Sequence, residues 1–326
     1  MGYKNIDGLM RHLRNNRIAI AGSKEKRQLL NTGYFHGYKG YRFFGTSGNK
    51  LPFTSYEEVY ATIQYDSKLK SLFYDKIMYI ETAVKNISLD CILTEANSES
   101  IQTICDKLMS SYNNAPATAT QAQKKKFQFH KLQLQSTIQS YLSRAYKEDN
   151  PKICHFYNNM SYSEVPIWAL VEIMTLGDFG FLLSCLDYNT RDAISKCLGL
   201  NLSCDTNREL IYKYIYALKD LRNAIAHNAV IFDTRFRGSD PSRPMTRCLE
   251  QEIGLPYVNF KTLGDYLILV CYYLQMLKVP KTEIKAFIRE FERITVEYKN
   301  SVHASISNIV IHPNLSSRIN ILRNYL

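Results

Sequence analysis

The stretch PFTSYEEVYATIQYDSKLKSLFYDKIMYIETAVKNISLDCIL, residues 52–93, repeats large apolar residues at intervals of mostly three or four. This spacing matches one face of an α-helix, which has 3.6 residues per turn. We expect a helix of about ten turns, opened by a capping box between Thr54 and Glu57 and interrupted near Asp66. Its apolar positions are Val59, Ile63, Leu69, Phe73, Ile77, Ile80, Val84 and Ile87.

Helical patterns continue along the rest of the chain, whereas alternating strand patterns are scarce. Residues 110–126 lose large apolar side chains and are expected to form a polar loop, followed by a more polar helix. Pro166 suits a first helical turn, and we expect Gly177 and Asp178 to end that helix and cap the next one. A further short helix should stop at Gly199. The sequence therefore predicts an all-α protein.

A second capping box, Thr206 with Glu209, is expected to open another helix. Its buried stripe is predicted to consist of Leu210, Tyr214, Ala217, Leu221 and Ala224. Residues 233–256 combine turn residues with arginines, which indicates an exposed basic loop. Two closing helices follow at about residues 262–278 and 281–299.

The composition suits a globular protein with an anionic partner. With 326 residues, 45% of them hydrophobic, the chain is long enough for one large domain or two ordinary ones. We expect a helical, aromatic N-terminal subdomain at residues 1–53 and a second helical domain at 54–326. The net charge of +11 favours nucleic acid as the partner. The longest apolar run, 267–277, is too short to span a membrane, and residues 1–16 show no apolar signal core. We therefore expect a cytoplasmic protein with no membrane partner.

The eight cysteines form neither a C-x-x-C pair nor a grouping with histidines at zinc spacing. Cys154 and His155 are neighbours, but the sequence offers no two further ligands nearby. We therefore expect reduced thiols in the core, no metal site and no cofactor.

Polar residues interrupt an apolar helix pattern in LRNAIAHNAVIFD, residues 221–233. Asn223 and His227 share a helix face with Lys219, whereas Arg222 lies about 140° around the axis from His227. Arg222 and His227 can meet if the helix bends or ends here, or if a second copy of the chain supplies one of them. Alternatively, His227 is a helix-end cation beside Asn223, and Arg222 is solvated.

Four sequence blocks resemble, in this order, the bacterial abortive-infection (Abi-like) family, a branch of the HEPN ribonuclease superfamily. They are GYFHGYKGYRFF (33–44), YIETAVKN (79–86), VPIWALVEIMTLGDFGFLLSCL (165–186) and LKDLRNAIAHNAVIFD (218–233). An Arg followed by a polar residue, with His four to six residues after the Arg, resembles the HEPN active-site signature. The resemblance covers about residues 5–235. It implies a HEPN-type helical bundle, with the N-terminal helical subdomain added to it, that works as a homodimer.

The resemblance also implies a metal-independent endoribonuclease that acts on the host's own RNA, in phage defence or as a toxin. It makes Arg222 and His227 the catalytic pair and Asn223 the polar residue usual after the Arg. The supporting residues are Glu81, Lys85, Lys219 and Asn228, the last at a position where many relatives have a second His. Lys85 stands where an Arg is usual, which puts a bidentate role there in doubt.

The residue types also fit this chemistry directly. RNA supplies its own nucleophile, the 2′-hydroxyl group. His227 suits the proton transfers, because an imidazole titrates near neutral pH and such groups give roughly 10²- to 10⁴-fold acceleration. Arg222 suits the growing phosphorane charge, because its guanidinium matches phosphate oxygens and stays protonated. The expected products are a 2′,3′-cyclic phosphate and a 5′-hydroxyl end.

Two basic clusters are candidates for RNA contacts. In QKKKFQFHK (123–131), lysines next to aromatic residues suit phosphate contacts and base stacking, although a solvated helix start is the simpler interpretation. The arginines after residue 233 either extend the positive field around His227 or form an ordinary charged loop. The candidate residues of the two clusters together are Lys124, Lys125, Lys126, Arg235, Arg237, Arg243 and Arg247. For the aromatic residues of 33–44, packing is favoured over base binding.

Two other functions remain open. The chain could be a noncatalytic RNA-binding module whose HEPN residues hold a small noncoding antitoxin RNA. It could also be the partner of a separate nucleotidyltransferase, since the sequence has no G-S-x(n)-D-x-D pattern of its own.

Overall fold

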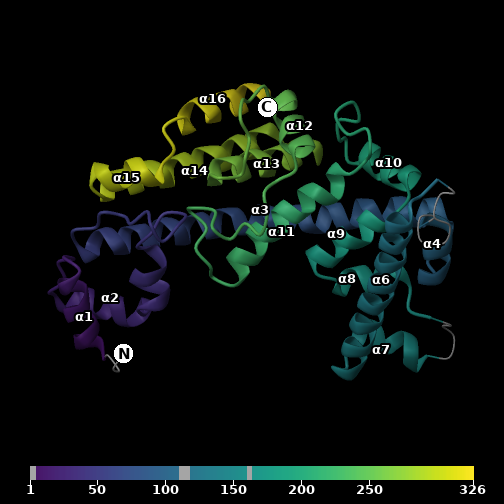
Figure 1. The fold of residues 1–326 in the computed structure, drawn as a ribbon, viewed down its shortest axis with the longest axis horizontal. Helices are drawn as coiled ribbons and strands as arrows, with labels where there is room; N and C mark the ends of the chain where they lie inside the picture. Colours follow the sequence, from purple (N-terminus) through teal and green to yellow (C-terminus); the bar gives the residue numbers. More distant parts are fainter. Residues whose placement is uncertain (1–4, 110–117, 160–163) are drawn as a thin grey trace. The chain divides into compact units, whose positions relative to one another are not determined.

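The computed structural model describes residues 5–109, 118–159 and 164–326. In these ranges every regular element is helical, and strand pairing is limited to isolated bridges such as that between Ala19 and Ser55 (Figure 1). The prediction of an all-α protein is therefore confirmed.

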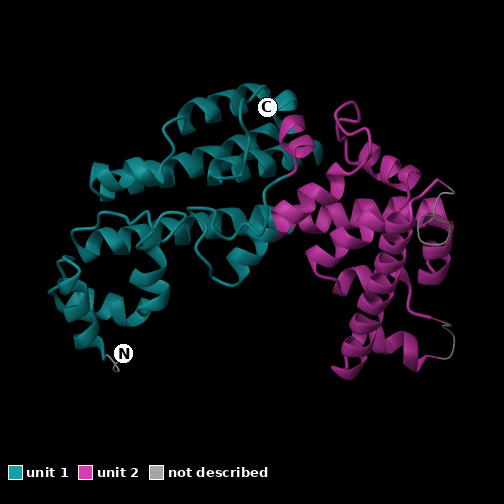
Figure 2. Cartoon of the chain, in the orientation of Figure 1, with its two compact units in different colours: residues 1–78, 220–241, 249–326 teal, residues 79–219, 242–248 magenta. Residues whose placement is uncertain are grey.

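Two compact units make up the chain, and they alternate along the sequence (Figure 2). The first unit comprises residues 1–78, 220–241 and 249–326, and the second comprises 79–219 and 242–248. Three helices therefore belong partly to each unit: α3 (Tyr56–Ala96), α11 (Leu210–Ala226) and α12 (Arg243–Ile253). The division into 1–53 and 54–326 stays a prediction about which segments fold independently.

The first unit has its core around an almost entirely buried helix, α13. Its remaining elements are α1 (Ile6–Asn15), α2 (Ser23–Thr32), the π-helical turn η1 (Phe35–Lys39), α13 (Leu263–Met276), α14 (Lys281–Ser301), α15 (Ala304–Val310) and α16 (Leu315–Tyr325). All residues from Leu263 to Leu274 are buried, and α13 packs against α14 and α16. The two predicted closing helices correspond to α13 and α14. The short helices α15 and α16 were not predicted from the sequence.

Helix α3 is longer than expected and begins one residue later. Ser55 caps it: the N–H of Glu58 donates to Oγ of Ser55, and Oε2 of Glu58 accepts from the N–H of Ser55. The predicted box of Thr54 with Glu57 is therefore wrong by one position. The expected break near Asp66 is also wrong, because Asp66 is buried within the continuous helix.

The second unit is a set of shorter helices. They are α4 (Ile101–Leu108), α6 (Gln121–Lys147), α7 (Pro151–Asn158), α8 (Ile167–Ile173), α9 (Leu176–Cys185) and α10 (Tyr188–Cys197). Residues 110–117 of the predicted polar loop lie outside the described residues. Residues 121–126 are helical, which corrects the end of that loop, because Thr120 and Gln123 form a capping box at the start of α6. Gly199 follows α10 with φ 74°, as its predicted role in ending the helix requires.

The turn between α8 and α9 differs from its prediction. Thr175 caps α9 by accepting from the N–H of Asp178, so Gly177 and Asp178 lie inside the first turn of α9 and do not end α8. Gly180 is needed for close packing, because a Cβ there would lie 3.0 Å from Ile215 and 3.1 Å from Tyr216 on α11. The absence of a side chain thus lets α9 approach α11.

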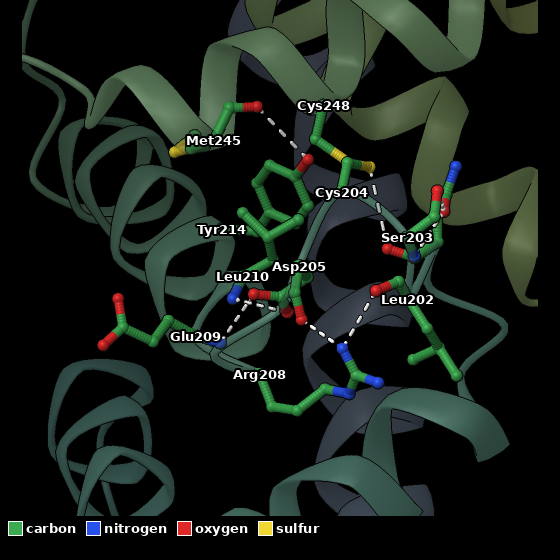
Figure 3. The surroundings of a disulfide bond; sticks show 11 residues. Leu202, Ser203, Cys204, Asp205, Arg208, Glu209, Leu210, Tyr214, Met245 and Cys248 are labelled. Carbon is green, nitrogen blue, oxygen red and sulfur yellow. Dashed lines mark hydrogen bonds between the residues drawn. A yellow bond between two sulfur atoms is a disulfide. The ribbon is translucent and has the colours of Figure 1, made fainter.

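A disulfide joins the segment before α11 to the middle of α12. Cys204 and Cys248 are bonded, 44 residues apart in the sequence, and the hydroxyl of Tyr214 donates to the carbonyl of Met245 at 3.3 Å beside them (Figure 3). The prediction that all cysteines are reduced is therefore wrong for this pair. The prediction of a basic loop throughout 233–256 is also wrong, since it includes α12.

Candidate active site

Asp205 opens the helix that bears the candidate catalytic residues. Its Oδ1 accepts from the N–H of Glu209 at 2.8 Å and its Oδ2 from that of Leu210 at 3.0 Å (Figure 3). The predicted capping box of Thr206 with Glu209 is therefore wrong, because a carboxylate one position earlier accepts from the first amides. Of the predicted stripe, Leu210, Tyr214, Leu221 and Ala224 are buried, whereas Ala217 is half-buried.

The other end of α11, in the first unit, closes with a Schellman motif. The N–H of Ala229 donates to the carbonyl of Ala224 at 2.8 Å, and that of Asn228 to the carbonyl of Ile225 at 3.1 Å. Asn228 has φ 51°, the left-handed conformation that this motif needs and that Asn adopts more readily than most residues. His227, just before it, is exposed at the carboxyl end of the helix.

Arg222 and Asn223 lie in the last turn of the same helix and are half-buried. Nη1 of Arg222 donates to Oδ1 of Asn223 at 3.4 Å, and the carbonyl of Asn223 accepts from the N–H of His227 at 2.9 Å. The helix ends after Ala226, between Arg222 and His227. This is one of the arrangements that the sequence left open for bringing the two side chains to a common phosphate.

A buried carboxylate fixes the chain that follows α11. Oδ1 of Asp66 accepts from the N–H groups of Ile231 and Phe232, both at 2.8 Å. Its Oδ2 accepts from the hydroxyl of Tyr41 at 2.8 Å and forms an ion pair of 2.8 Å with Nζ of Lys70. Asp66 is fully buried, and these donors replace the water it loses on folding. Asp66 therefore joins α3 to the segment after the candidate site.

Lys70 extends this network to the end of α11. Its Nζ donates to Oδ1 of Asn228 at 2.9 Å while it pairs with Asp66. A charge-assisted hydrogen bond thus holds the residue next to His227. Sequence reasoning missed both Asp66 and Lys70 as site residues. The available signal was an acidic residue inside an otherwise apolar helix pattern, which we interpreted as a break.

The aromatic segment 33–44 packs against the same part of the chain. The ring of Tyr41 stacks on Phe232 with centroids 5.9 Å apart and an angle of 9° between planes, and Phe44 also lies 5.9 Å from Phe232. The packing interpretation of this segment is confirmed for these rings.

Arg235 and Arg237 bind other parts of the first unit. Arg235 donates to the carbonyls of Gly40 and Phe43 at 2.9 and 2.7 Å and pairs with buried Asp233. Arg237 likewise donates to a backbone carbonyl and pairs with a carboxylate. Their charges are thus partly balanced within the unit, which weakens their candidacy as phosphate ligands.

The other basic candidates lie on helices of the second unit. Lys124, Lys125 and Lys126 in α6, and Arg243 and Arg247 in α12, are all exposed. Phe129 follows the lysines with 62% of its surface exposed, and His130 contacts Phe181. Burial and, to a lesser degree, the charge of Lys126 lower the pKa of His130 below its usual value. The first turns of α6 thus have three exposed lysines followed by an exposed aromatic ring.

Buried Glu81 and half-buried Lys85 form an ion pair within the second unit. Nζ of Lys85 lies 3.2 Å from Oε1 of Glu81 and donates to the carbonyl of Met174 at 2.8 Å. Lys85 therefore supports the turn between α8 and α9. Lys219, also in this unit, passes close to Gly177, where a Cβ would lie 3.0 Å from its Cδ.

The end of α11 and its anchoring residues lie in a segment shared with other proteins. A family model for Abi-like proteins matches residues 27–233. The chain belongs to the Abi-like family. No curated protein and no solved structure matched the chain. The Abi-like segment includes Arg222, His227 and the Asp66–Lys70 pair, and it ends at Asp233. Membership of the Abi-like family suggests that this protein has an abortive-infection function.

Two general features of this Abi-like chain concern metals and membranes. Within the described residues, no three His, Cys, Asp or Glu side chains group in a way that could bind a metal ion. In the same parts of the chain, no helix has both the length and the apolar character needed to cross a bilayer.

Proposed function

We propose that this Abi-like protein is a HEPN-type endoribonuclease that cleaves RNA without a metal ion, in the cytoplasm, as an abortive-infection or toxin protein. The observation that carries the proposal is the exposed imidazole of His227 at the end of α11, five residues after Arg222. The net charge of +11 supports an anionic substrate.

In the proposed reaction, the 2′-hydroxyl of RNA attacks the adjacent phosphorus. An imidazole takes the proton from this hydroxyl or gives a proton to the leaving 5′-oxygen, and His227 is exposed to solvent and substrate for either transfer. The guanidinium of Arg222 stabilises the charge of the phosphorane. Asn223 orients Arg222 through their hydrogen bond. The 5′-oxygen leaves, and the products are a 2′,3′-cyclic phosphate and a 5′-hydroxyl.

We propose further that two copies of the chain form the site. A neutral imidazole cannot serve as base and acid at once, and each α11 offers one imidazole in this motif. Two copies of the helix end across a two-fold axis would supply one imidazole for each proton transfer and two guanidinium groups for the phosphate.

A noncatalytic RNA-binding function is the second candidate. The exposed Lys124–Lys126 and Phe129 on α6 favour it, because phosphate contacts and stacking are enough to hold a small antitoxin RNA. Under this alternative, His227 contacts RNA but transfers no proton.

Brief expression in a bacterial host separates the two candidates. We expect the wild type to slow growth and fragment cellular RNA, and His227→Ala to do neither at equal soluble amounts. His36→Ala, another exposed histidine of the first unit, is the matched control and should behave as the wild type. Fragmentation by His227→Ala equal to that by the wild type would exclude His227 as a catalytic residue. Growth inhibition without RNA fragmentation, with RNA bound to the purified protein, would favour the second candidate.

A further inference from the structure

The excess positive charge of the chain is concentrated near its N-terminus. Residues 5–50 contain nine Lys and Arg side chains but two carboxylates, those of Asp7 and Glu25, so they account for +7 of the net charge of +11. Such a local excess attracts a polyanion more strongly than the same charges spread over the whole surface. The helices of this part, α1, α2 and η1, belong to the first unit, which also contains the end of α11 (Figure 2).

Both carboxylates of this part already have partners. Oε2 of Glu25 accepts from the N–H groups of Ala21 and Gly22 at 2.7 and 3.1 Å, at the start of α2. Asp7 of α1 pairs with Nζ of Lys26 of α2 at 2.6 Å, which shows that the exposed sides of the two helices adjoin. The hydrogen bond and charge of Lys26, followed by the charge of Arg11, hold the pKa of Asp7 below its usual value. The region around this pair is therefore positive.

The remaining cations of the two helices are exposed. Arg11 on α1, Arg17 just after it, and Lys24 and Arg27 on α2 are exposed, and their side chains form no hydrogen bond or ion pair with any described residue. Lys24 and Arg27 are three residues apart and share a face of α2. These four residues, here called the N-terminal basic surface, are thus available to an anionic partner.

This surface is attached to the segment that follows the candidate site. The N–H of Ala19, between α1 and α2, donates to the carbonyl of Thr54 at 2.8 Å, directly before α3. The N–H of Gly45 donates to Oδ2 of Asp233 at 2.8 Å, and Asp233 follows His227 by six positions. The N-terminal basic surface and the exposed imidazole therefore belong to the same compact unit.

The apolar side chains of the same helices mostly face inward. Met10 and Leu13 of α1 and Leu29 of α2 are buried, and the large apolar side chains exposed in this part are Leu30 and Phe35, on separate elements. A helix that lies on a membrane inserts a continuous apolar face into it. These helices have no such face, whereas exposed cations are enough to bind the phosphates of a nucleic acid. The surface therefore fits a nucleic acid better than a membrane.

We propose that the N-terminal basic surface binds the phosphate backbone of the RNA substrate, beside the nucleotides that occupy the candidate site. The identity of the nucleic acid as RNA rests on the proposed ribonuclease function. Backbone contacts carry no sequence information, so the surface raises the affinity for RNA of any sequence. A dinucleotide has a single phosphodiester group, which the candidate site occupies, and it gains no affinity from the surface.

Binding is measured by fluorescence anisotropy on the purified full-length chain. The probe is a labelled single-stranded RNA of about 20 nucleotides with methylated 2′-hydroxyls, which lacks the nucleophile and stays intact. Arg11→Gln/Lys24→Gln/Arg27→Gln should weaken binding about 10-fold or more at about 0.1 M salt. The slope of log affinity against log salt should become shallower by about 2, because each phosphate contact contributes about 0.7.

The matched control removes three exposed cations from α14 of the same unit. Lys281→Gln/Arg289→Gln/Lys299→Gln should bind RNA as the wild type does, at equal melting temperatures of all three proteins. Lys24→Gln alone changes one exposed side chain and should reduce the slope by about 0.7, which tests the surface even if the triple variant is less stable.

Cleavage assays separate this inference from the function on which it rests. For an RNA of about 20 nucleotides, the α1–α2 triple variant should raise KM about 10-fold or more at unchanged kcat, and cleavage of a dinucleotide should not change. A wild type that binds RNA through these residues but cleaves none would refute the ribonuclease function and leave the surface assigned.

Three results would overturn the inference. They are no RNA binding by the wild type, wild-type affinity in the α1–α2 triple variant, and an equal loss of affinity in the α14 variant. Vesicles of phosphatidylglycerol test the membrane alternative. If the α1–α2 triple variant lost vesicle binding but kept its RNA affinity, the surface would be assigned to a membrane instead.

Discussion

The Nζ of Lys70 donates a 2.9 Å hydrogen bond to Oδ1 of Asn228, the residue that directly follows His227. The same ammonium group pairs with buried Asp66, whose other oxygen accepts from the N–H groups of Ile231 and Phe232. The end of α11 is therefore positioned by two residues of α3 that are distant in the sequence.

Lys70→Met should lower the free energy of unfolding by roughly 3 kcal/mol, because it leaves the buried carboxylate of Asp66 without its cation. Lys68→Met is the matched control. Lys68 also pairs with a carboxylate, that of Glu297, but both side chains are exposed, and such pairs contribute about 0–1 kcal/mol. Urea unfolding at neutral pH measures both variants. Equal losses in the two would mean that the Asp66 network does not stabilise the fold.

Glu58→Gln should destabilise the protein at pH 7 and lose this effect in acid. Burial raises the pKa of Glu58, but hydrogen bonds from Thr54, His303 and Ser55 outweigh it, so the pKa lies below its usual value. A carboxyl group with a lowered pKa contributes stability that is complete above its unfolded pKa of about 4.3 and is lost as the pH falls through the folded value.

Urea unfolding of Glu58→Gln and the wild type at several pH values between about 7 and 3 checks this prediction. The difference between them should shrink below about pH 4. Glu57→Gln, the exposed neighbour, should match the wild type throughout. A larger effect from Glu57→Gln than from Glu58→Gln would place the cap where the sequence suggested.

Much of the fold follows from helical spacing alone, whereas the helix ends do not. Each predicted capping box was displaced by one residue, because Ser55 and Asp205 also have oxygens that can cap a helix. The spacing of apolar residues tolerates a shift of one position, so the choice depends on which side chain reaches the first amides. Helix α12 was not predicted, because the arginines and turn residues around it are typical of loops.

Only those residues of the candidate site that are close together in the sequence could be predicted. The sequence marks Arg222, Asn223 and His227 because polar residues interrupt an apolar pattern. It gives no sign that Asp66 bonds to residues 231 and 232, since that contact forms across 165 residues of chain. For the same reason the disulfide could not be read from spacing, as Cys204 and Cys248 are 44 residues apart.

Breaking this disulfide should destabilise the second unit. It closes a long loop that includes all of α11, and loss of such a constraint costs roughly 3–4 kcal/mol through the entropy of the unfolded chain. Cys204→Ser/Cys248→Ser should therefore melt at a lower temperature than the wild type under non-reducing conditions, and a reductant should remove the difference. Cys154→Ser, a free cysteine, is the control. Identical melting temperatures without reductant, with both thiols free by peptide mapping, would show that the bond does not form.

Mixed dimers test whether two chains share the proposed site. We expect tagged Arg222→Ala/His227→Ala protein, co-expressed and purified with wild type, to reduce cleavage per wild-type chain by about 10²-fold, because each site loses a proton-transfer group and a cation. Arg289→Ala/His36→Ala, which changes exposed residues of the same types, should leave that activity unchanged. Full activity per wild-type chain in mixed dimers would mean that each chain has a complete site.

Cleavage of a defined RNA by purified protein in EDTA, with mapping of the new ends, tests the ribonuclease proposal most directly. We predict that the wild type leaves 2′,3′-cyclic phosphate and 5′-hydroxyl ends and that His227→Ala is slower by about 10²-fold or more at an unchanged melting temperature. Activity that appears only when Mg²⁺ is restored, or that His227→Ala retains in full, would contradict it.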